Sequence, residues 1–354
     1  MLDQSGSDLS ELREPSRAAE SVSLVYSSDE EPGFRRKRAG RGFFYVTAKG
    51  GKLTDAKHLH RIRMLAIPPA WTDVWIAANP DGHLQATGRD VKGRKQYRYH
   101  ERWAACRDAV KFSGLASFAE SLPTLRGAVD SDLRRRGLPC ERVIASVVWL
   151  LDNTMIRVGN AAYARDNGSF GLTTLKSRHL EIEGAKLRFS FKGKSGKEWR
   201  LKLVDRRIAG VMRSIQELPG QHLFQYQDED GDRRSVRSED VNAYIRDAIG
   251  AEFSSKHFRT WGGTVHAATL LSTTPLPETK TARNRTLNGV IDTVAAKLGN
   301  TRAVCRSCYI HPDILDAWQA GNLTDEIAAA RRSWRKLPDG FDEEEMTVLR
   351  WLQR

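Results

Sequence analysis

The sequence contains few cysteines and no long apolar run, and each absence excludes a class of protein. Its 354 residues include four cysteines, too few and too scattered for a disulfide framework. No apolar segment approaches the roughly 20 residues that a membrane span needs. The N-terminus is polar and acidic, unlike a secretory signal peptide. We therefore expect a cytoplasmic protein with reduced thiols and no membrane partner.

The cysteines also lack the partners that a metal or redox site would need. Cys305 and Cys308 form a C-x-x-C pair, but structural zinc needs four ligands, and His311 is the only nearby candidate for a third. A thioredoxin-like pair would follow a strand and open a helix, whereas this pair follows a helical pattern. The sequence thus favours buried or half-buried structural thiols and predicts no metal.

Two further motifs are incomplete. The segment "GKS" at 193–195 ends like a phosphate-binding loop, but the first glycine of that motif is replaced by Arg188. The segment also opens a strand rather than a helix, so we expect no ATP requirement and no cofactor. The acidic segment 227–232 resembles fragments of a calcium loop, and we interpret it as a solvated loop.

Charge is abundant and unevenly distributed. The net charge is +13, yet residues 1–34 hold eight acidic and two basic residues, a net of −6, so the other 320 residues carry +19. A basic body of this size suggests a polyanionic partner, usually nucleic acid, although a solvated arginine-rich surface is the alternative. Residues 1–34 are poor in apolar residues, which predicts a disordered acidic tail.

The pattern along the chain predicts an α+β protein. Residues 35–105 read mainly as strands and predict a small N-terminal β-sheet domain. Residues 106–324 read as a larger, mainly α-helical domain with one inserted β-hairpin, and residues 325–354 as a C-terminal helical extension. Apolar residues from Val143 to Met155 at helical spacing predict a core helix that ends near Gly159–Asn160.

The hairpin is predicted by strict alternation. Leu187, Phe189 and Phe191 should point to one face of the sheet, and the residues between them to the other. The turn "KGKSGK" follows, and its glycines would allow a ligand to approach the backbone closely.

Tyr309, in the stretch "VCRSCYIHP", raises the question of chemistry. A tyrosine hydroxyl with a pKa of about 10 is a poor nucleophile unless cations stabilise its phenolate. Arg157 at the end of the core helix and Lys194 in the hairpin turn could supply such cations. "KHFRTWGG" adds Lys256 and Arg259, one helical turn apart on the same face. Each signal is weak alone, because such side chains are usually solvated charges or helix-dipole partners.

The order of these positions resembles the type IB DNA topoisomerases, in particular the small poxvirus-like and bacterial members. The resemblance covers about residues 35–312. "RRKRAGRGFFYV", "IPPAWTDVWI" and "GRDVKGRKQYRYHERW" are similar to the N-terminal domain of that family. "RVGNAAY", "FKGKSGK", "KHFRTWGGT" and "CYIHP" are similar to its catalytic domain. The resemblance implies a tyrosine recombinase/topoisomerase IB-like fold, with residues 106–324 as the catalytic domain.

The resemblance also implies a role for each matching residue. Tyr309 matches the nucleophile that forms a 3′-phosphotyrosyl link and releases a 5′-hydroxyl. Arg157 and Arg259 match the arginines that hold the non-bridging phosphate oxygens, and Lys194 matches the general acid. Asn300 stands where the poxvirus pattern has histidine. It can donate a hydrogen bond but cannot carry charge, so any pH dependence due to that histidine should be absent.

Further residues match positions that contact DNA. Lys256 resembles a residue beside the scissile phosphate, and Tyr163 matches a tyrosine that contacts the DNA backbone. In the N-terminal domain, "GRKQYRYHERW" interleaves bases with aromatic residues. From it we expect DNA contacts by Arg94, Lys95, Arg98, Tyr97 and Tyr99. A basic edge strand with tyrosines packed on its sheet is the structural alternative.

The sequence therefore predicts a type IB DNA topoisomerase that relaxes supercoiled double-stranded DNA without ATP or metal. We expect a monomer that clamps around DNA in the nucleoid, with 35–105 as the clamp domain. A tyrosine recombinase would share the nucleophile but act as a synaptic oligomer. A non-catalytic DNA-binding protein with the same fold would shift plasmid mobility and leave no covalent adduct.

Overall fold

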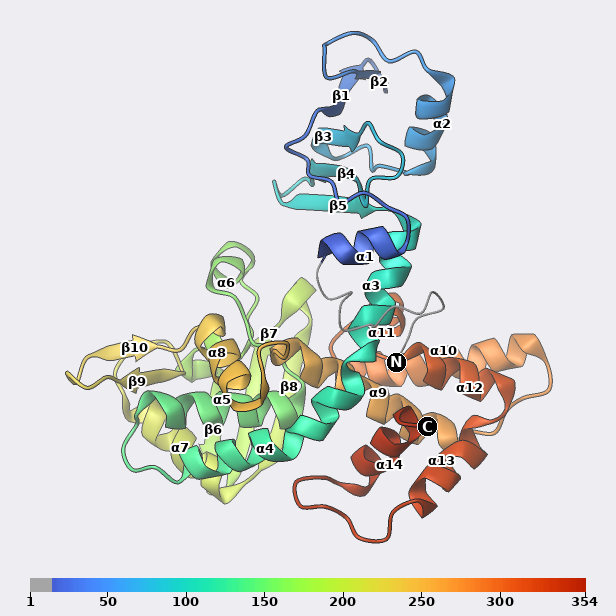
Figure 1. Ribbon diagram of the computed structural model, residues 1–354. Helices are drawn as coiled ribbons and strands as arrows, with labels where there is room; N and C mark the ends of the chain where they lie inside the picture. Colours follow the sequence, from blue (N-terminus) through green and yellow to red (C-terminus); the bar gives the residue numbers. More distant parts are fainter. Residues whose placement is uncertain (1–14) are drawn as a thin grey trace. The chain divides into compact units, whose positions relative to one another are not determined.

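The computed structural model describes residues 15–354, except for the side chains of residues 108–110. The chain forms two compact units, which we call unit 1, ending at Gly114, and unit 2, from Leu115 to Arg354 (Figure 1). Unit 1 contains an antiparallel sheet, and unit 2 is mostly helical, which confirms the predicted α+β class. Within the described range, no helix has the length and apolar character needed to cross a membrane.

Unit 1 is built on a five-stranded antiparallel sheet with strand order β2-β1-β3-β4-β5. The strands are β1 (Gly33–Ala39), β2 (Gly42–Val46), β3 (Thr72–Ala77), β4 (Leu84–Arg89) and β5 (Lys95–Tyr99). Helix α2 (Ala56–Met64) lies beside the sheet (Figure 1). It places Ile62 in a core formed with strand residues such as Val74 and Ile76. Within residues 15–354, β5 pairs only with β4, so the strand that carries the predicted DNA contacts is an edge of the sheet.

The prediction of a disordered tail is wrong for residues 15–34. Helix α1 (Pro15–Ser21) buries Ala18 and Ala19 in a small apolar cluster with Trp103 of α3 (Glu101–Ser113). Leu24, which follows α1, is buried in the same cluster, so a few apolar residues dock a segment that is polar overall. Residues 1–14 of the predicted tail lie outside the described residues. Because α3 contacts α1, unit 1 extends to Gly114, beyond the predicted domain boundary at residue 105.

Helices make up most of unit 2. In chain order they are α4 (Leu115–Leu133), α5 (Cys140–Thr154), α6 (Ala161–Asn167), α7 (Arg206–Glu217), α8 (Ser238–Ile249), α9 (Ser255–Ser272), α10 (Lys280–Lys297), α11 (Arg302–Cys308), α12 (Pro312–Ala320), α13 (Leu323–Arg332) and α14 (Glu343–Leu352). α9 contacts α4, α5 and α10 as well as α12, α13 and α14, so it is a central helix of the unit.

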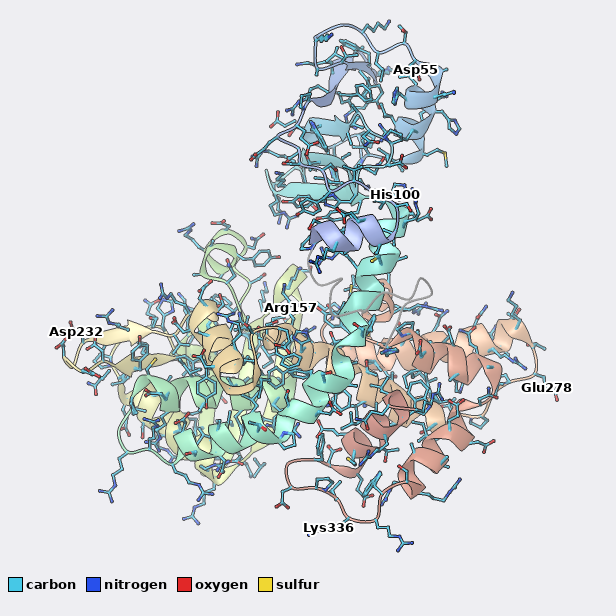
Figure 2. All side chains as sticks on the ribbon, in the orientation of Figure 1. Asp55, His100, Arg157, Asp232, Glu278 and Lys336 are labelled. Carbon is cyan, nitrogen blue, oxygen red and sulfur yellow. The ribbon has the colours of Figure 1, made fainter. Side chains whose placement is uncertain are left out.

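The predicted hairpin is present as β7 (Lys186–Lys192) and β8 (Glu198–Val204). β6 (Leu180–Glu183) adds a third strand that the sequence analysis did not anticipate. Leu187, Phe189 and Phe191 are buried while the residues between them are exposed, which confirms the predicted alternation. The acidic segment 227–232 connects the two short strands β9 (Gln225–Gln227) and β10 (Arg233–Ser235), and Asp232 is labelled in Figure 2.

The core helix ends earlier than predicted. α5 stops at Thr154, and Met155 follows in the left-handed conformation with φ 55°. The predicted end near Gly159–Asn160 is wrong because Asn160 instead caps α6, where its side chain accepts a hydrogen bond from the Tyr163 backbone N–H. Arg157 therefore lies in the connection between α5 and α6, where Figure 2 labels it, and not at a helix end.

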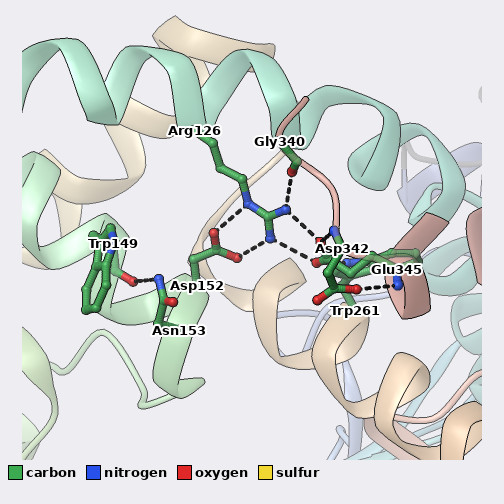
Figure 3. Close-up of polar contacts among 8 residues, drawn as sticks. All are labelled: Arg126, Trp149, Asp152, Asn153, Trp261, Gly340, Asp342 and Glu345. Atoms are coloured by element: carbon green, nitrogen blue, oxygen red, sulfur yellow. Dashed lines mark hydrogen bonds and ion pairs between the residues drawn. The ribbon is translucent and has the colours of Figure 1, made fainter. Parts of the chain in front are cut away.

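The C-terminal segment is an integral part of unit 2. The predicted boundary between residues 324 and 325 falls inside α13, so a separate extension is not present. Glu345 of α14 accepts hydrogen bonds from Arg126 of α4 at 2.6 and 2.9 Å and from the indole of Trp261 of α9 at 2.9 Å (Figure 3). Arg126 also pairs with Asp152 of α5. One buried network thus joins the last helix to the helix that carries Arg259.

Candidate active site

Tyr309 follows α11 directly and is half-buried. Its backbone N–H donates to the Cys305 carbonyl at 2.9 Å. Its own carbonyl accepts from the Thr264 hydroxyl at 3.5 Å, and the same hydroxyl accepts from the His311 backbone N–H at 3.0 Å. Thr264 is fully buried on α9. α11 therefore holds the backbone on the N-terminal side of Tyr309, and Thr264 of α9 holds it on the C-terminal side.

Two adjacent glycines allow α9 to approach this closely. A Cβ on Gly263 would lie 2.5 Å from the Tyr309 carbonyl oxygen, and a Cβ on Gly262 would lie 2.3 Å from the Met155 sulfur. Both distances are far below van der Waals contact, so neither position accepts a side chain without movement. Glycine in a helix interior costs about 1 kcal/mol relative to alanine. Here the cost is offset by close packing against two segments of the site.

Arg259 lies beside the ring of Tyr309. The residue is 3 % exposed, and its guanidinium carbon lies 4.8 Å from the centroid of the tyrosine ring. Its Nη1 donates to the Met155 carbonyl, and its Nη2 donates to the Leu298 carbonyl at 2.7 Å. The left-handed turn at Met155, which ends α5 early, is thus also what presents a carbonyl to the guanidinium.

The cations around Tyr309 shift its acidity. Burial alone would raise the pKa of Tyr309, but the charge and hydrogen bond of Arg259, together with the charge of Arg157, lower it below its ordinary value of about 10. Burial lowers the pKa of Arg259 to about 10, and the charge of Arg157 acts in the same direction. The lowered pKa of Tyr309 is the change expected of a tyrosine that acts as a nucleophile.

Asn300 and Arg157 form a second part of the site. Arg157 Nη2 donates to Asn300 Oδ1, and this bond fixes the orientation of the amide. The amide nitrogen is therefore the group that remains for another acceptor. Among the described residues, the buried atoms without a hydrogen-bond partner include Asn300 Nδ2 and Arg259 Nε. Unpaired buried donors are unfavourable, and both of these are available to donate to the oxygens of a bound anion.

Lys194 is linked to this site through its hairpin. The residue is exposed, in a helical turn at Lys194–Gly196 between β7 and β8. Three positions later, Lys197 Nζ donates to the Asn300 carbonyl at 2.6 Å. The turn that carries Lys194 is thus tied to the segment that carries Asn300.

Lys256 and Tyr163 occupy different surroundings. Lys256 is exposed in the first turn of α9, whereas Arg259 on the same helix is buried, so the two predicted neighbours differ in environment. Tyr163 is half-buried in α6, the helix that follows the Arg157 segment. Their predicted contacts with DNA remain predictions.

The N-terminal candidates all lie in unit 1, at or next to β5. Tyr97 and Tyr99 are 46 % and 42 % exposed, and their rings stack with centroids 5.9 Å apart. Lys95 pairs with Asp29 at 2.7 Å, and Arg94 pairs with Asp90 at 2.6 Å. Arg98 donates to the Ala66 carbonyl and lies over the Trp71 ring. The aromatic residues are thus accessible, while two of the three bases already have acidic partners.

The cysteines have the structural role that the sequence favoured. Cys305 is fully buried and Cys308 is partly buried, and neither of them forms a disulfide. Burial raises the pKa of Cys305 to about 11, which keeps the thiol protonated and unreactive. Within residues 15–354, the structure has no group of three or more histidine, cysteine or acidic side chains arranged to hold a metal ion.

Several residues of the site were not identified from the sequence. Lys197 lies in the same "GKSGK" turn as Lys194, and the motif gave no reason to select the second lysine. Thr264 and Met155 act through backbone contacts that residue type does not reveal. Gly262 and Gly263 did carry a signal, because a glycine pair within a helical pattern indicates close approach of another segment.

Comparisons with known proteins agree with this geometry. Residues 95–336 match the model for the eukaryotic DNA topoisomerase I catalytic core, and residues 42–90 match the model for the bacterial DNA topoisomerase IB N-terminal domain. The chain is 33 % identical to DNA topoisomerase 1B of Acanthamoeba polyphaga mimivirus over 294 residues, covering 81 % of this chain and 88 % of the viral protein. It is 23 % identical to DNA topoisomerase I of monkeypox virus over 310 residues, covering 81 % and 93 %. A DNA topoisomerase 1B of vaccinia virus is 28 % identical over 173 residues, covering 44 % and 53 %.

Proposed function

The chain belongs to the type IB DNA topoisomerase family, and on this premise we propose that it relaxes supercoiled duplex DNA through a covalent bond to Tyr309. The phenolate oxygen attacks a backbone phosphorus, and the P–O5′ bond breaks. The 3′-phosphate is then carried on the tyrosine, while the 5′-oxygen takes up a proton and leaves as a hydroxyl. Rotation of the free end is followed by the reverse reaction, which reseals the strand.

The contact between Arg259 and the ring of Tyr309 is the observation that carries this proposal. The attack requires a phenolate and creates additional negative charge on the phosphate oxygens. Arg259 lowers the pKa of the phenol and has an unpaired Nε, and Asn300 has an unpaired Nδ2. Preorganised donors of this kind stabilise a transition state, and loss of one typically costs about 2.7–4 kcal/mol of barrier.

Lys194 is the proposed general acid and Arg157 the second cation at the phosphate. Lys194 is exposed in a turn that Lys197 attaches to Asn300. Its side chain is flexible and its ammonium carries three donors, which suits the delivery of a proton to the leaving oxygen. Arg157 holds the Asn300 amide by one nitrogen and retains further donors for a phosphate oxygen. Lys256 and Tyr163 would contact the DNA backbone beside the site.

The proposed reaction needs neither ATP nor a metal ion. A phosphotyrosyl diester replaces a phosphodiester of similar type, so the energy for resealing is retained in the covalent intermediate. We expect a monomer that clamps DNA in the nucleoid, with unit 1 as well as unit 2 contacting the duplex. The exposed Tyr97 and Tyr99 support contacts from unit 1.

A plasmid assay tests the proposal. Supercoiled plasmid without any special sequence is incubated with monomeric protein in EDTA without ATP, and Tyr309→Phe serves as the control. Relaxation by the wild type alone, with a detergent-stable protein–DNA adduct, is expected. Relaxation by Tyr309→Phe would exclude Tyr309 as the nucleophile. Binding without relaxation would indicate a non-catalytic protein, and activity that requires two paired duplexes would indicate a recombinase.

A further inference from the structure

Lys197 makes a contact that the roles assigned so far do not use. Its Nζ donates to the backbone carbonyl of Asn300 at 2.6 Å, across 103 positions of sequence. Asn300 is thereby held twice, since Arg157 binds its side chain and Lys197 binds its backbone. A lysine ammonium on a neutral carbonyl is a charge-assisted bond, which is stronger than a neutral one.

Trp199 reinforces the same connection by packing. It is 7 % exposed and stacks on Phe191 with ring centroids 6.0 Å apart. A Cβ on Gly299 would lie 2.7 Å from the indole, and a Cβ on Gly193 would lie 2.6 Å from its nitrogen. Only glycine at both positions lets the indole lie between the hairpin turn and the segment before Asn300.

These contacts surround the turn that carries Lys194. Gly193 and Lys197 close the turn through a backbone hydrogen bond of 2.7 Å. The side chain of Lys194 is exposed, so it is the base of the turn that limits where its ammonium can reach. The fixed points of that base are Lys197 and Trp199, and both of them contact the 299–300 segment.

We propose that Lys197, Trp199 and Gly299 form a hairpin latch that positions Lys194 for protonation of the departing 5′-oxygen. The inference rests on the proposed function and adds to it a positioning role for Lys197. When the latch is open, the turn moves away from Asn300, and the nucleophile and phosphate contacts remain while the proton donor is displaced. The latch acts on a single step of the reaction, which makes its role separable from general stability.

A sulfur leaving group provides the test. Single-turnover cleavage is measured on a duplex in which the bridging 5′-oxygen at one site is replaced by sulfur, and on the matched oxygen substrate. A thiol has a pKa of about 8.5, so the sulfur leaves as a thiolate without a proton donor. General acid catalysis contributes about 10²–10⁴-fold, so a displaced acid slows only the oxygen substrate.

Lys197→Met should cleave the oxygen substrate at least about tenfold more slowly than wild type, and the sulfur substrate within about threefold. Lys197→Arg can still donate to the carbonyl and should retain the wild-type rate on both substrates. Lys202→Met removes the same charge from an exposed position of β8 and should change neither rate. Gly193→Ala provides a second route, because its Cβ would lie 2.6 Å from the indole nitrogen of Trp199, and should give the same pattern as Lys197→Met.

Three outcomes would overturn the latch. Equal loss on both substrates would mean that Lys197 supports folding or DNA binding instead. If Lys197→Arg cleaves the oxygen substrate slowly but the sulfur substrate at the wild-type rate, Lys197 is itself the general acid. Wild-type rates for Lys197→Met on both substrates would mean that the contact has no catalytic effect. Lys194→Ala is measured in parallel, and if it cleaves the sulfur substrate as slowly as the oxygen substrate, Lys194 is not the general acid. A covalent adduct formed by Tyr309→Phe would instead refute the proposed function as a whole.

Discussion

Gly263→Ala tests whether cleavage depends on the close contact between α9 and Tyr309. The new Cβ would lie 2.5 Å from the Tyr309 carbonyl oxygen, whereas ordinary contact begins at 3.4 Å, so the backbone must move by about 0.9 Å. The obstructing atom belongs to the backbone, so a side-chain rotation cannot relieve it. A misplacement of about 1 Å can cost about 10²-fold in rate, and overpacking of this kind costs roughly 1–3 kcal/mol of stability.

The assay is single-turnover cleavage of a DNA duplex with enzyme in excess, well below the unfolding temperature. Gly263→Ala should reduce the rate about 100-fold. Gly289→Ala, in α10, is the matched control, because its Cβ would meet nothing within 4 Å. It should keep the wild-type rate and gain up to about 1 kcal/mol of stability. A rate for Gly263→Ala close to that of Gly289→Ala would show that the position of Tyr309 does not depend on this contact.

Three further predictions concern charge. In urea unfolding, Glu345→Gln should lower the free energy of unfolding by roughly 2–4 kcal/mol, because Arg126 loses a buried carboxylate. Glu343→Gln removes an exposed ion pair and should lower it by at most about 1 kcal/mol. Burial raises the pKa of Glu345 but the Arg126 bonds outweigh it and lower the pKa. The stability difference between wild type and Glu345→Gln should therefore be largest above the ordinary carboxyl pKa of about 4.3. It should disappear as the pH falls through the lower pKa of Glu345 in the folded state. A stability difference that grows in acid would contradict this. Asn300→Asp keeps an acceptor for the bound arginine but replaces the Nδ2 donor with negative charge, so single-turnover cleavage should fall at least about 10²-fold, and an unchanged rate would exclude Asn300 from the phosphate site. The phenolate absorbance of wild type minus Tyr309→Phe should titrate below about pH 10, and a midpoint above 10 would contradict the effect of Arg259.

The sequence indicated candidate residues for the site but not the way in which they are brought together. Tyr309 and Arg259 stand in short motifs, and the structure places the Arg259 guanidinium beside the Tyr309 ring. Asn300 was selected by its distance along the chain from Tyr309. The helix before Arg157 was predicted to be too long, because apolar spacing continues past Thr154 while the chain turns at Met155. A non-glycine residue in the left-handed conformation is uncommon, and nothing in its residue type indicates it.

Other differences have the same origin in tertiary contacts. Residues 15–34 looked disordered because their composition is polar, yet Ala18, Ala19 and Leu24 are buried in one cluster with Trp103 of α3. Glu345 is the last of four consecutive acids in the sequence, and only the packing of α14 makes it a buried partner of Arg126. Lys194 and Lys197 are equivalent in a one-dimensional pattern, and the fold alone distinguishes them. Local sequence determines periodicity, whereas long-range burial determines which polar groups are paired.

The most direct measurement is identification of the residue that carries DNA after cleavage. Cleavage of a duplex is stopped with denaturant, and the trapped adduct is digested with protease and nuclease. Mass spectrometry then identifies the modified peptide, and the released DNA end is analysed separately. We expect a nucleotide linked to the Tyr309 hydroxyl oxygen through its 3′-phosphate, and a free 5′-hydroxyl on the released DNA end. A nucleotide on any other residue, or an adduct linked through a 5′-phosphate, would contradict the claim that the cations around Tyr309 make it the nucleophile.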